Sequence, residues 1–183
     1  MRINGDTGNN AGVSDALQLQ TRAVSVSAIH EASLSGQAFS WNAVTYDPDA
    51  ADTALLVRND SPTKNLVIER VYFRCDTATA FDIHIVTASF TIAGTLAVTG
   101  VCLNKSSPTV ADATAYGDET GNTQGDIILT GYAPLAVNAQ ATTSLPQDVN
   151  LAGSVILGQN QAIGVDIVTA STAVECTIVG YFL

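Results

Sequence analysis

Two short apolar runs that face each other across a polar turn give the strongest constraint on the fold. Residues 55–74 read LLVRNDSPTKNLVIERVYFR, and Pro62 in the turn cannot donate a backbone hydrogen bond to a strand ladder. Short β-forming runs bounded by such a loop predict a hairpin. No long amphipathic helical stretch alternates with runs of this kind, which argues against a parallel α/β fold. The chain is therefore expected to build antiparallel sheets.

The same pattern of short strand and polar turn recurs along most of the chain. Turn signals such as GDETGNTQGD and LGQNQ separate the runs. About eight short strands separated by turns are typical of an antiparallel β-sandwich or jelly roll. The predicted strands are 37–46, 53–59, 65–74, 79–90, 97–103, 126–131, 148–157, 162–169 and 172–182.

Alternation within these strands predicts which side chains face the core. In the strand at 79–90 it places Phe81 and Ile83 on one face and His84 on the other. In the last strand it sets Cys176 and Ile178 against the polar positions between them. In 65–74 it predicts two largely apolar faces, with Val67, Val71 and Phe73 on one and Leu66, Ile68 and Tyr72 on the other.

The domain organisation follows from length and from a change of pattern near residue 36. A chain of 183 residues suits one domain that buries about 70% of its unfolded surface. Residues 1–35 begin polar and rich in Gly and Asn, then alternate, which predicts an extended N-terminal arm laid on another surface. A short helix near 27–34 is an alternative for part of the arm. Residues 36–183 form the β-sandwich domain.

Charge and hydropathy exclude several classes of partner. The apolar runs are far shorter than the roughly 20 residues that a membrane span needs, and the first residues lack the layout of a signal peptide. We therefore expect a soluble protein made in a cytoplasm, with no membrane partner. The net charge is −10, and residues 106–183 contain seven acids but no Lys or Arg. Because phosphate binding needs clustered Lys and Arg, direct nucleic-acid binding is not expected.

Catalytic chemistry has little support. The two histidines, His30 and His84, lie in no motif that orients a base beside a nucleophile, and we interpret His84 as a side chain on a sheet face. Cys75, Cys102 and Cys176 lie in or beside apolar strands, as buried free cysteines do. We therefore expect no enzyme activity, no catalytic residue and no cofactor.

Acidic residues in two turns are weak candidates for a metal site. Asp47, Asp49 and Asp52 in YDPDAAD could supply carboxylate oxygens to calcium, but the loop lacks the glycine and glutamate of an EF-hand. A solvated turn without metal is the preferred interpretation. Asp118 and Glu119 in the GDETGN turn receive the same interpretation.

The remaining signal is the character of the surface. The chain has 26 alanines and 21 threonines, and only 13% of its residues are charged. Small and β-branched side chains lose little entropy when a contact orders them. This composition favours a subunit that covers much of its surface with neighbours. The alternative is a compact acidic monomer that its net charge keeps soluble.

Three stretches carry a resemblance to a known group of proteins. LQTRAVSVSAIHEASLSGQAFSWNAVTYD, DTALLVRNDSPTKNLVIERVYF and LNKSSPTVADATAYGD resemble segments of tailed-bacteriophage virion proteins, and the resemblance spans most of residues 18–183. It implies a jelly-roll capsid decoration (cement) protein on the capsid exterior, made in the host cytoplasm. It also implies a homo-oligomer, with a trimer favoured, that bridges subunits of the major capsid protein. The candidate coat contacts in the arm are Arg2, Leu17, Leu19, Arg22, Val24 and Val26.

Two other classes stay open. A trimeric head- or tail-fibre domain that binds host glycans would use exposed aromatic side chains, for which Trp41, Tyr46, Tyr116 and Tyr132 are candidates. A carbohydrate-active enzyme on a β-sandwich would need a carboxylate pair, and the sequence singles out no such pair.

Overall fold

The computed structural model describes most of the chain from residue 26 onwards. Arg2, Leu17, Leu19, Arg22 and Val24, the candidate coat contacts of the arm other than Val26, lie outside the described residues. The calcium candidate Asp47 also lies outside them. The described residues are 26–46, 49, 52–86, 94, 96–134, 145–171 and 173–183.

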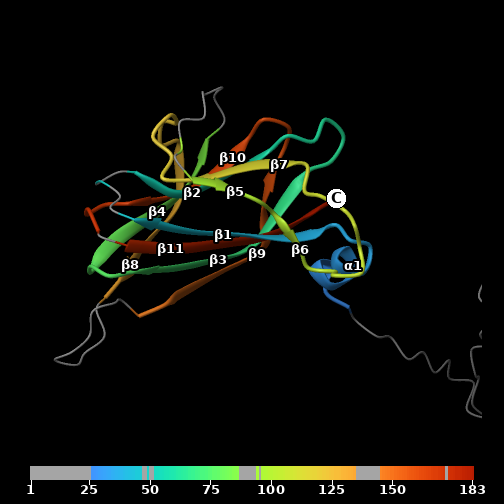
Figure 1. The fold of residues 1–183 in the computed structure, drawn as a ribbon, viewed down its shortest axis with the longest axis horizontal. Coiled ribbons are helices and arrows are strands. Elements are labelled where there is room, and N and C mark those ends of the chain that lie inside the picture. Colours follow the sequence, from blue (N-terminus) through green and yellow to red (C-terminus); the bar gives the residue numbers. More distant parts are fainter. Residues whose placement is uncertain are drawn as a thin grey trace, which may run out of the picture.

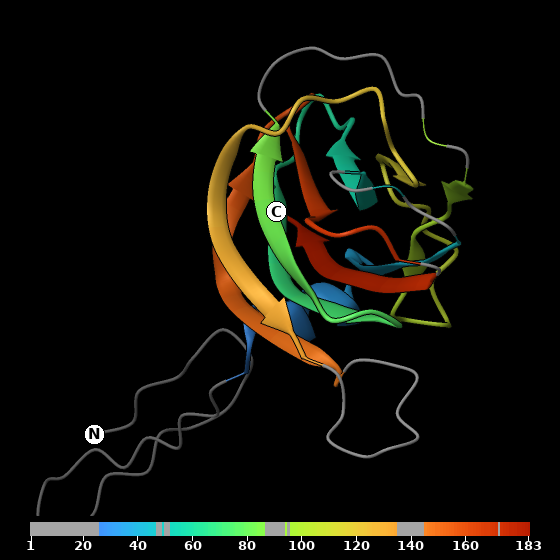
Figure 2. The ribbon, with the colours of Figure 1, turned by 90° about the vertical axis from the view of Figure 1, so that its left-hand side faces the viewer.

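Two antiparallel sheets pack against each other, which confirms the predicted all-β sandwich (Figures 1 and 2). The five-stranded sheet has the order β6 (Val101–Cys102), β1 (Ala38–Tyr46), β11 (Ala173–Phe182), β3 (Leu66–Cys75) and β9 (Gln147–Leu157). The six-stranded sheet has the order β5 (Leu96–Val98), β7 (Ala113–Gly117), β2 (Thr53–Asn59), β10 (Ala162–Ile167), β4 (Thr79–Val86) and β8 (Asp126–Ala133).

The strands pair as nested partners from the two ends of the domain. β1 pairs with β11, β2 with β10, β3 with β9 and β4 with β8, all antiparallel. The pairs alternate between the sheets and are joined within each sheet by β11 against β3 and by β10 against β4. A long antiparallel ribbon rolled up in this way is a jelly roll. Strands β5, β6 and β7 are an insertion between β4 and β8.

Aromatic side chains fill the space between the sheets. Phe39, Trp41, Phe73 and Phe81 are at most 1% exposed. The rings of Phe73 on β3 and Phe81 on β4 stack with centroids 4.5 Å apart, so this contact joins the two sheets. Because Trp41 is fully buried, its suggested role in binding glycans is wrong. A Cβ at Gly100 would come within 2.6 Å of the indole Nε1, so the chain runs close over this ring.

A β-bulge corrects the predicted faces of the strand at 65–74. Val179 pairs with Arg70 and Gly180 with Ile68, which leaves Glu69 as an extra residue in β3. The bulge shifts the alternation, because one added residue exchanges the faces of everything beyond it. The core-facing side chains of β3 are therefore Leu66, Ile68, Val71, Phe73 and Cys75.

The insertion between β4 and β8 also differs from the prediction. The single strand expected at 97–103 is two short strands in different sheets, because β5 pairs with β7 and β6 pairs with β1. Residues 113–117, where no strand was predicted, form β7 beside β2. Alternation alone cannot show that a chain crosses from one sheet to the other within a run of β-forming residues.

The short helix suggested near 27–34 is present as α1 (Ala28–Leu34). Its Ala32 packs with Ile29 against Ala38, Val67 and Tyr181 on the outer face of the five-stranded sheet (Figure 1). This packing explains why Val67, on the face opposite the main core, is only 1% exposed. Within the described part of the chain, no helix is long and apolar enough to span a membrane.

Candidate functional site

A row of four side chains crosses the outer face of the five-stranded sheet. Asn42 on β1 pairs with Thr177 on β11, Thr177 pairs with Tyr72 on β3, and Tyr72 pairs with Asp148 on β9. Side chains directly opposite each other on one face lie within contact distance. Their strand neighbours Phe73, Cys176 and Ile178 point into the core, which turns this row outwards.

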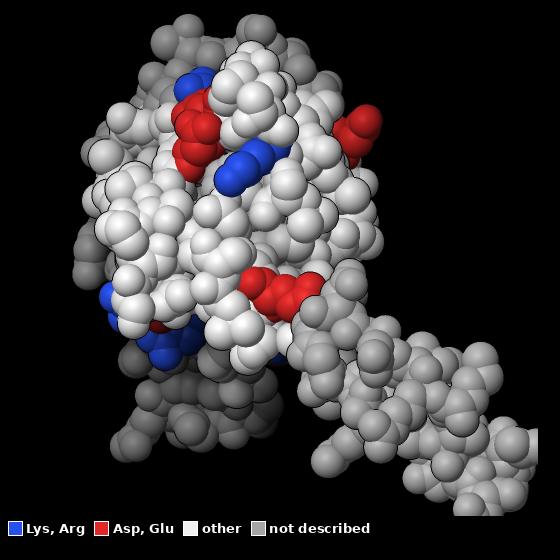
Figure 3. All heavy atoms as spheres, turned by 90° about the vertical axis from the view of Figure 1, so that its right-hand side faces the viewer, with Lys and Arg blue, Asp and Glu red and all other residues white. Residues whose placement is uncertain are grey.

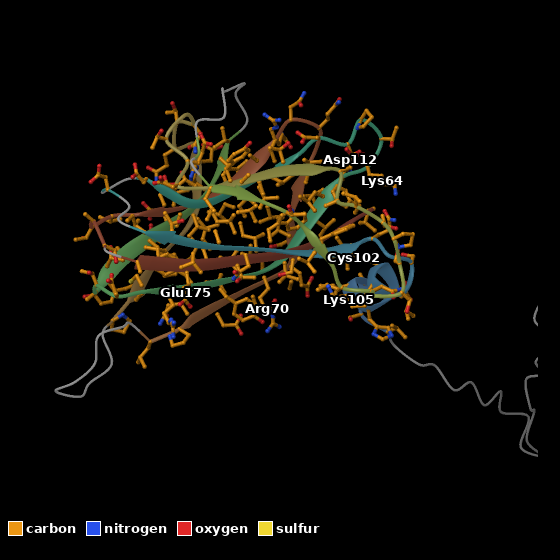
Figure 4. The ribbon with its side chains drawn as sticks, in the orientation of Figure 1. Lys64, Arg70, Cys102, Lys105, Asp112 and Glu175 are labelled. Carbon is orange, nitrogen blue, oxygen red and sulfur yellow. The ribbon has the colours of Figure 1, made fainter. Side chains whose placement is uncertain are left out.

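Hydrogen bonds and ion pairs fix the side chains along this row. The Asn42 amide donates to Thr177 Oγ1 at 2.6 Å, and an Arg70 guanidinium nitrogen lies 3.4 Å from the Tyr72 hydroxyl. Arg70, which is labelled in Figure 4, also pairs with Asp148 at 3.2 Å. In the adjacent row, Arg74 pairs with Glu175 at 2.5 Å. Each arginine thus has a carboxylate partner, and the charges of these two pairs cancel.

These side chains surround a groove of about 160 Å³, which we call the Tyr72 groove. Its polar wall comes from Asn42, Arg74, Glu175 and Thr177, and Pro146 lies at the start of β9. The ring of Tyr72 is 39% exposed beside this wall. An accessible aromatic ring next to fixed donors and acceptors can stack on a small polar molecule and hydrogen-bond to it.

A second polar cluster lies buried on the outer face of the six-stranded sheet. Asp166 Oδ1 accepts hydrogen bonds from Thr53 Oγ1 at 2.5 Å and from His84 Nε2 at 2.9 Å. The backbone N–H of Gly125 donates to His84 Nδ1 at 3.3 Å. With Nδ1 accepting this bond, Nε2 is the nitrogen that donates to Asp166. His84 lies on a sheet face, as interpreted from the sequence, and it is 0% exposed there.

The buried cluster does not have the arrangement of a catalytic triad. In such a triad the imidazole lies between the carboxylate and the hydroxyl, whereas the Thr53 hydroxyl bonds directly to Asp166. Thr53, His84 and Asp166 are all at most 5% exposed. The Asn122 amide donates a hydrogen bond to the Thr53 hydroxyl at 3.1 Å. The cluster therefore stabilises the sheet under the 118–125 loop, and a substrate cannot reach it.

Among the described residues no group of three or more His, Cys, Asp or Glu side chains could hold a metal ion, and the candidate set of Asp47, Asp49 and Asp52 stays a prediction because Asp47 lies outside these residues. The backbone N–H of Asp49 donates to the Asp52 carboxylate at 2.8 Å, which closes the turn. Partial burial raises the pKa of Asp52, although this hydrogen bond lowers it. The nearby Asp118 and Asp49 carboxylates raise the pKa further. Glu119 is 1% exposed, so the solvated-turn interpretation is wrong for it. Its carboxylate accepts from the backbone N–H groups of Gly94 and Gly121.

Four exposed apolar side chains lie on α1, on β6 and on the segment after β6, at the end of the sandwich that faces the viewer in Figure 3. The Asn104 side chain donates to the carbonyl of Leu34, and the Leu103 N–H donates to the carbonyl of Ala38. These bonds hold the chain after β6 against the end of α1. We call Leu34, Val101, Leu103 and Val110 the α1–β6 patch, and their side chains are 67%, 46%, 42% and 76% exposed.

The residues singled out from the sequence lie apart in the structure. Val26, a candidate coat contact, is 40% exposed just before α1. Tyr116 on β7 is partly buried, and Tyr132 is 59% exposed on β8, towards the opposite edge of the same sheet. Tyr46 ends β1, and its side chain is outside the described part of the structure.

Tyr72 was missed as a site residue, although the alternation of 65–74 had placed it on one face with the basic positions of its strand. That signal named a face of a strand, and it could not show the polar partners that β1, β9 and β11 bring to the same face.

Comparisons with known proteins add no relative. A scan against protein-family models found no match, and searches of curated proteins and of solved structures found no match either.

Proposed function

We propose that this chain is a decoration (cement) protein of a tailed-bacteriophage capsid, made in the host cytoplasm and bound to the exterior of the coat lattice. It acts as a structural subunit, in a trimer, and bridges subunits of the major capsid protein. The resemblance of three sequence stretches to virion proteins motivates this function. The structural observation that supports it is the α1–β6 patch, a set of exposed apolar side chains at the end of the sandwich that carries α1, the first described element.

The patch has the properties of a contact surface. Soluble domains rarely expose several large apolar side chains together unless a partner covers them. A hydrogen bond from Asn104 to α1 and one from Leu103 to β1 hold the segment after β6 in place, so little order has to be gained on binding. Specific interfaces bury about 1,600 Å² in total, more than the patch alone supplies. The remaining area would come from the N-terminal segment and from repetition of weak contacts within a trimer.

Single-charge substitutions in the patch test this proposal. Leu34→Asp and Val110→Asp place a carboxylate on the patch at well-exposed positions, so the domain should still fold. In a sedimentation assay with coat-only capsids, the wild-type chain should saturate the shell at a fixed copy number, and both variants should lose most binding. Val168→Asp is the matched control, since Val168 is 51% exposed and follows β10 at the far end of the sandwich.

Deleting residues 1–25 tests the second part of the surface. The truncated chain should remain folded and should no longer saturate capsids. Full binding by the truncated chain would rule out a role for the arm. Full binding by Leu34→Asp and Val110→Asp would rule out the patch.

A fibre domain that recognises host glycans is the alternative function. It shares the fold and the exposed position but requires an accessible aromatic ring beside hydrogen-bonding groups, which the Tyr72 groove provides.

A further inference from the structure

We propose that the Tyr72 groove is a binding site for one neutral pyranose unit of a glycan. The groove lies on the outer face of the five-stranded sheet, and its lining residues are distinct from those of the α1–β6 patch. The proposal therefore does not depend on attachment to a coat, and it would hold for a capsid subunit or for a fibre domain.

The aromatic ring supplies the first element of a sugar site. Tyr72 is 39% exposed in the interior of β3, with a neighbouring strand on each side. The Arg70 guanidinium lies 3.4 Å from its hydroxyl and orients the side chain. One face of a pyranose ring presents C–H groups, which pack well against the electron-rich face of an aromatic ring. Tyr72 can thus hold the apolar face of a sugar while its hydroxyl stays at the polar rim.

The wall of the groove supplies the second element, hydrogen-bonding groups of both kinds. Each sugar hydroxyl both donates and accepts, as any hydroxyl does. The groove offers donors from the Asn42 amide and the Arg74 guanidinium, and acceptors from the Glu175 carboxylate. The bonds of Asn42 to Thr177 and of Arg74 to Glu175 already fix these side chains, so binding orders few groups.

Charge selects a neutral ligand. Arg70 pairs with Asp148 and Arg74 pairs with Glu175, so the four charges around Tyr72 sum to zero. A phosphate or a sialic acid carboxylate would have to compete with these carboxylates for the guanidinium groups. A neutral polyhydroxyl ligand can bond to both members of each pair without separating them.

The open groove has room for contact with about one sugar ring. A volume of about 160 Å³ corresponds to roughly five water molecules at about 30 Å³ each. A single ring in such a site should bind with a dissociation constant on the order of 1 mM. Repetition of the site in an oligomer or on a shell would raise the effective affinity for a surface that carries many copies of the sugar.

Saturation-transfer NMR with the full chain tests the proposal. The probes are the methyl glycosides of glucose, galactose, mannose and N-acetylglucosamine, with free sialic acid as the anionic comparison. At least one neutral glycoside should receive saturation from the wild-type chain, with stronger transfer than sialic acid. Tyr72→Ala should weaken binding about tenfold or more, because the stacking surface is lost, whereas Tyr72→Phe should keep most of it.

Two further variants separate the groove from other causes. Tyr132→Ala removes another exposed tyrosine, on the other sheet, and should bind as the wild type does. Thr177→Val keeps the shape of the side chain but removes the hydroxyl that accepts from Asn42, so it should weaken binding even if Tyr72→Ala folds poorly.

The proposal is overturned if no neutral glycoside binds, if sialic acid binds more strongly, or if Tyr72→Ala and Thr177→Val both bind like the wild type. It is also overturned if Tyr72→Ala turns an oligomer into a monomer in sedimentation, because the groove would then be covered by a second copy.

Discussion

The imidazole of His84 on β4 occupies the space in which residue 164 on β10 would carry a side chain. His84 and Gly164 pair directly across the two strands, and a Cβ on Gly164 would stand 2.4 Å from His84 Nε2. The ring cannot move aside cheaply, because Asp166 and the Gly125 N–H hold both of its nitrogens. Glycine at position 164 is therefore required by the close approach of this ring.

Gly164→Ala should lower the free energy of unfolding by about 1–3 kcal/mol, the usual cost of inserting a methyl group into a filled space. The measurement is urea unfolding followed by the fluorescence of Trp41, the single, fully buried tryptophan. The double variant Gly164→Ala with His84→Ala is the control, since the alanine methyl then has room. A Gly164→Ala penalty of the same size with and without the imidazole would disprove the steric explanation.

The carboxylate of Asp166 should contribute to stability through its two buried hydrogen bonds. Asp166→Ala leaves the Thr53 hydroxyl without its acceptor and the His84 Nε2–H unpaired. The free energy of unfolding should fall by about 3 kcal/mol. Asp166→Asn keeps an oxygen that can accept both bonds and should cost clearly less. Chemical denaturation of both variants beside Thr53→Val checks this order. Equal losses for Ala and Asn would show that charge, and not hydrogen bonding, is what Asp166 contributes.

The sequence predicted the sandwich because period-two alternation survives in most of its strands. In β11, Cys176 and Ile178 do face the core, as alternation requires. Alternation failed in β3, where the extra Glu69 shifts the phase, because a bulge depends on pairing with β11 and not on composition. The nested pairing of strands from the two ends of the domain is likewise a long-range property that no local pattern contains.

The candidate sites were less predictable for the same reason. Glu119 lies in a Gly- and Asn-rich turn, which favours a solvated side chain, yet its buried carboxylate accepts hydrogen bonds from the N–H of Gly121 in the same turn and from the N–H of Gly94 on a distant segment. Trp41 is a candidate glycan contact by residue type, but its side chain lies on the inward face of β1. Tyr72 is a candidate only because the register of β1, β11, β3 and β9 places Asn42, Thr177 and Asp148 in one row with it.

The buried thiol of Cys176 should make the protein less stable at alkaline pH. Burial raises the pKa of this thiol well above its usual value, so the folded state keeps it neutral. Its contribution is fully present below the pKa of an unfolded thiol, about 8.5, and is lost as pH rises above that value and the unfolded chain ionises. Unfolding free energy should fall by up to about 1.4 kcal/mol per pH unit from this group alone.

Urea unfolding between about pH 7.5 and pH 10, under reducing conditions, measures this slope. Cys176→Ala should be less stable near pH 7.5 because it leaves a small cavity, but its slope should be flatter by one proton, so the difference from the wild type should shrink as the pH rises. Tyr181, whose pKa burial also raises, adds a loss only towards the upper end of the range. Identical slopes for the wild type and Cys176→Ala would mean that this thiol does not govern the alkaline limb.

The stacked rings of Phe73 and Phe81 should couple the two sheets energetically. They come from β3 and β4, on opposite sheets, with centroids 4.5 Å apart and planes inclined by 25°. Phe73→Leu and Phe81→Leu keep apolar volume but remove one ring of the pair. A double-mutant cycle in urea should return an interaction free energy of about 0.5–1.5 kcal/mol, as expected for offset aromatic pairs.

The matched cycle uses Phe39 and Phe182, whose rings meet edge-on 5.7 Å apart within the five-stranded sheet layer. If contacts across their interface make the two sheets unfold as one unit, each single variant should still unfold in one cooperative transition. The double-mutant cycle should nevertheless show the Phe73–Phe81 coupling. A second transition in either single variant would instead mean that each sheet can unfold separately.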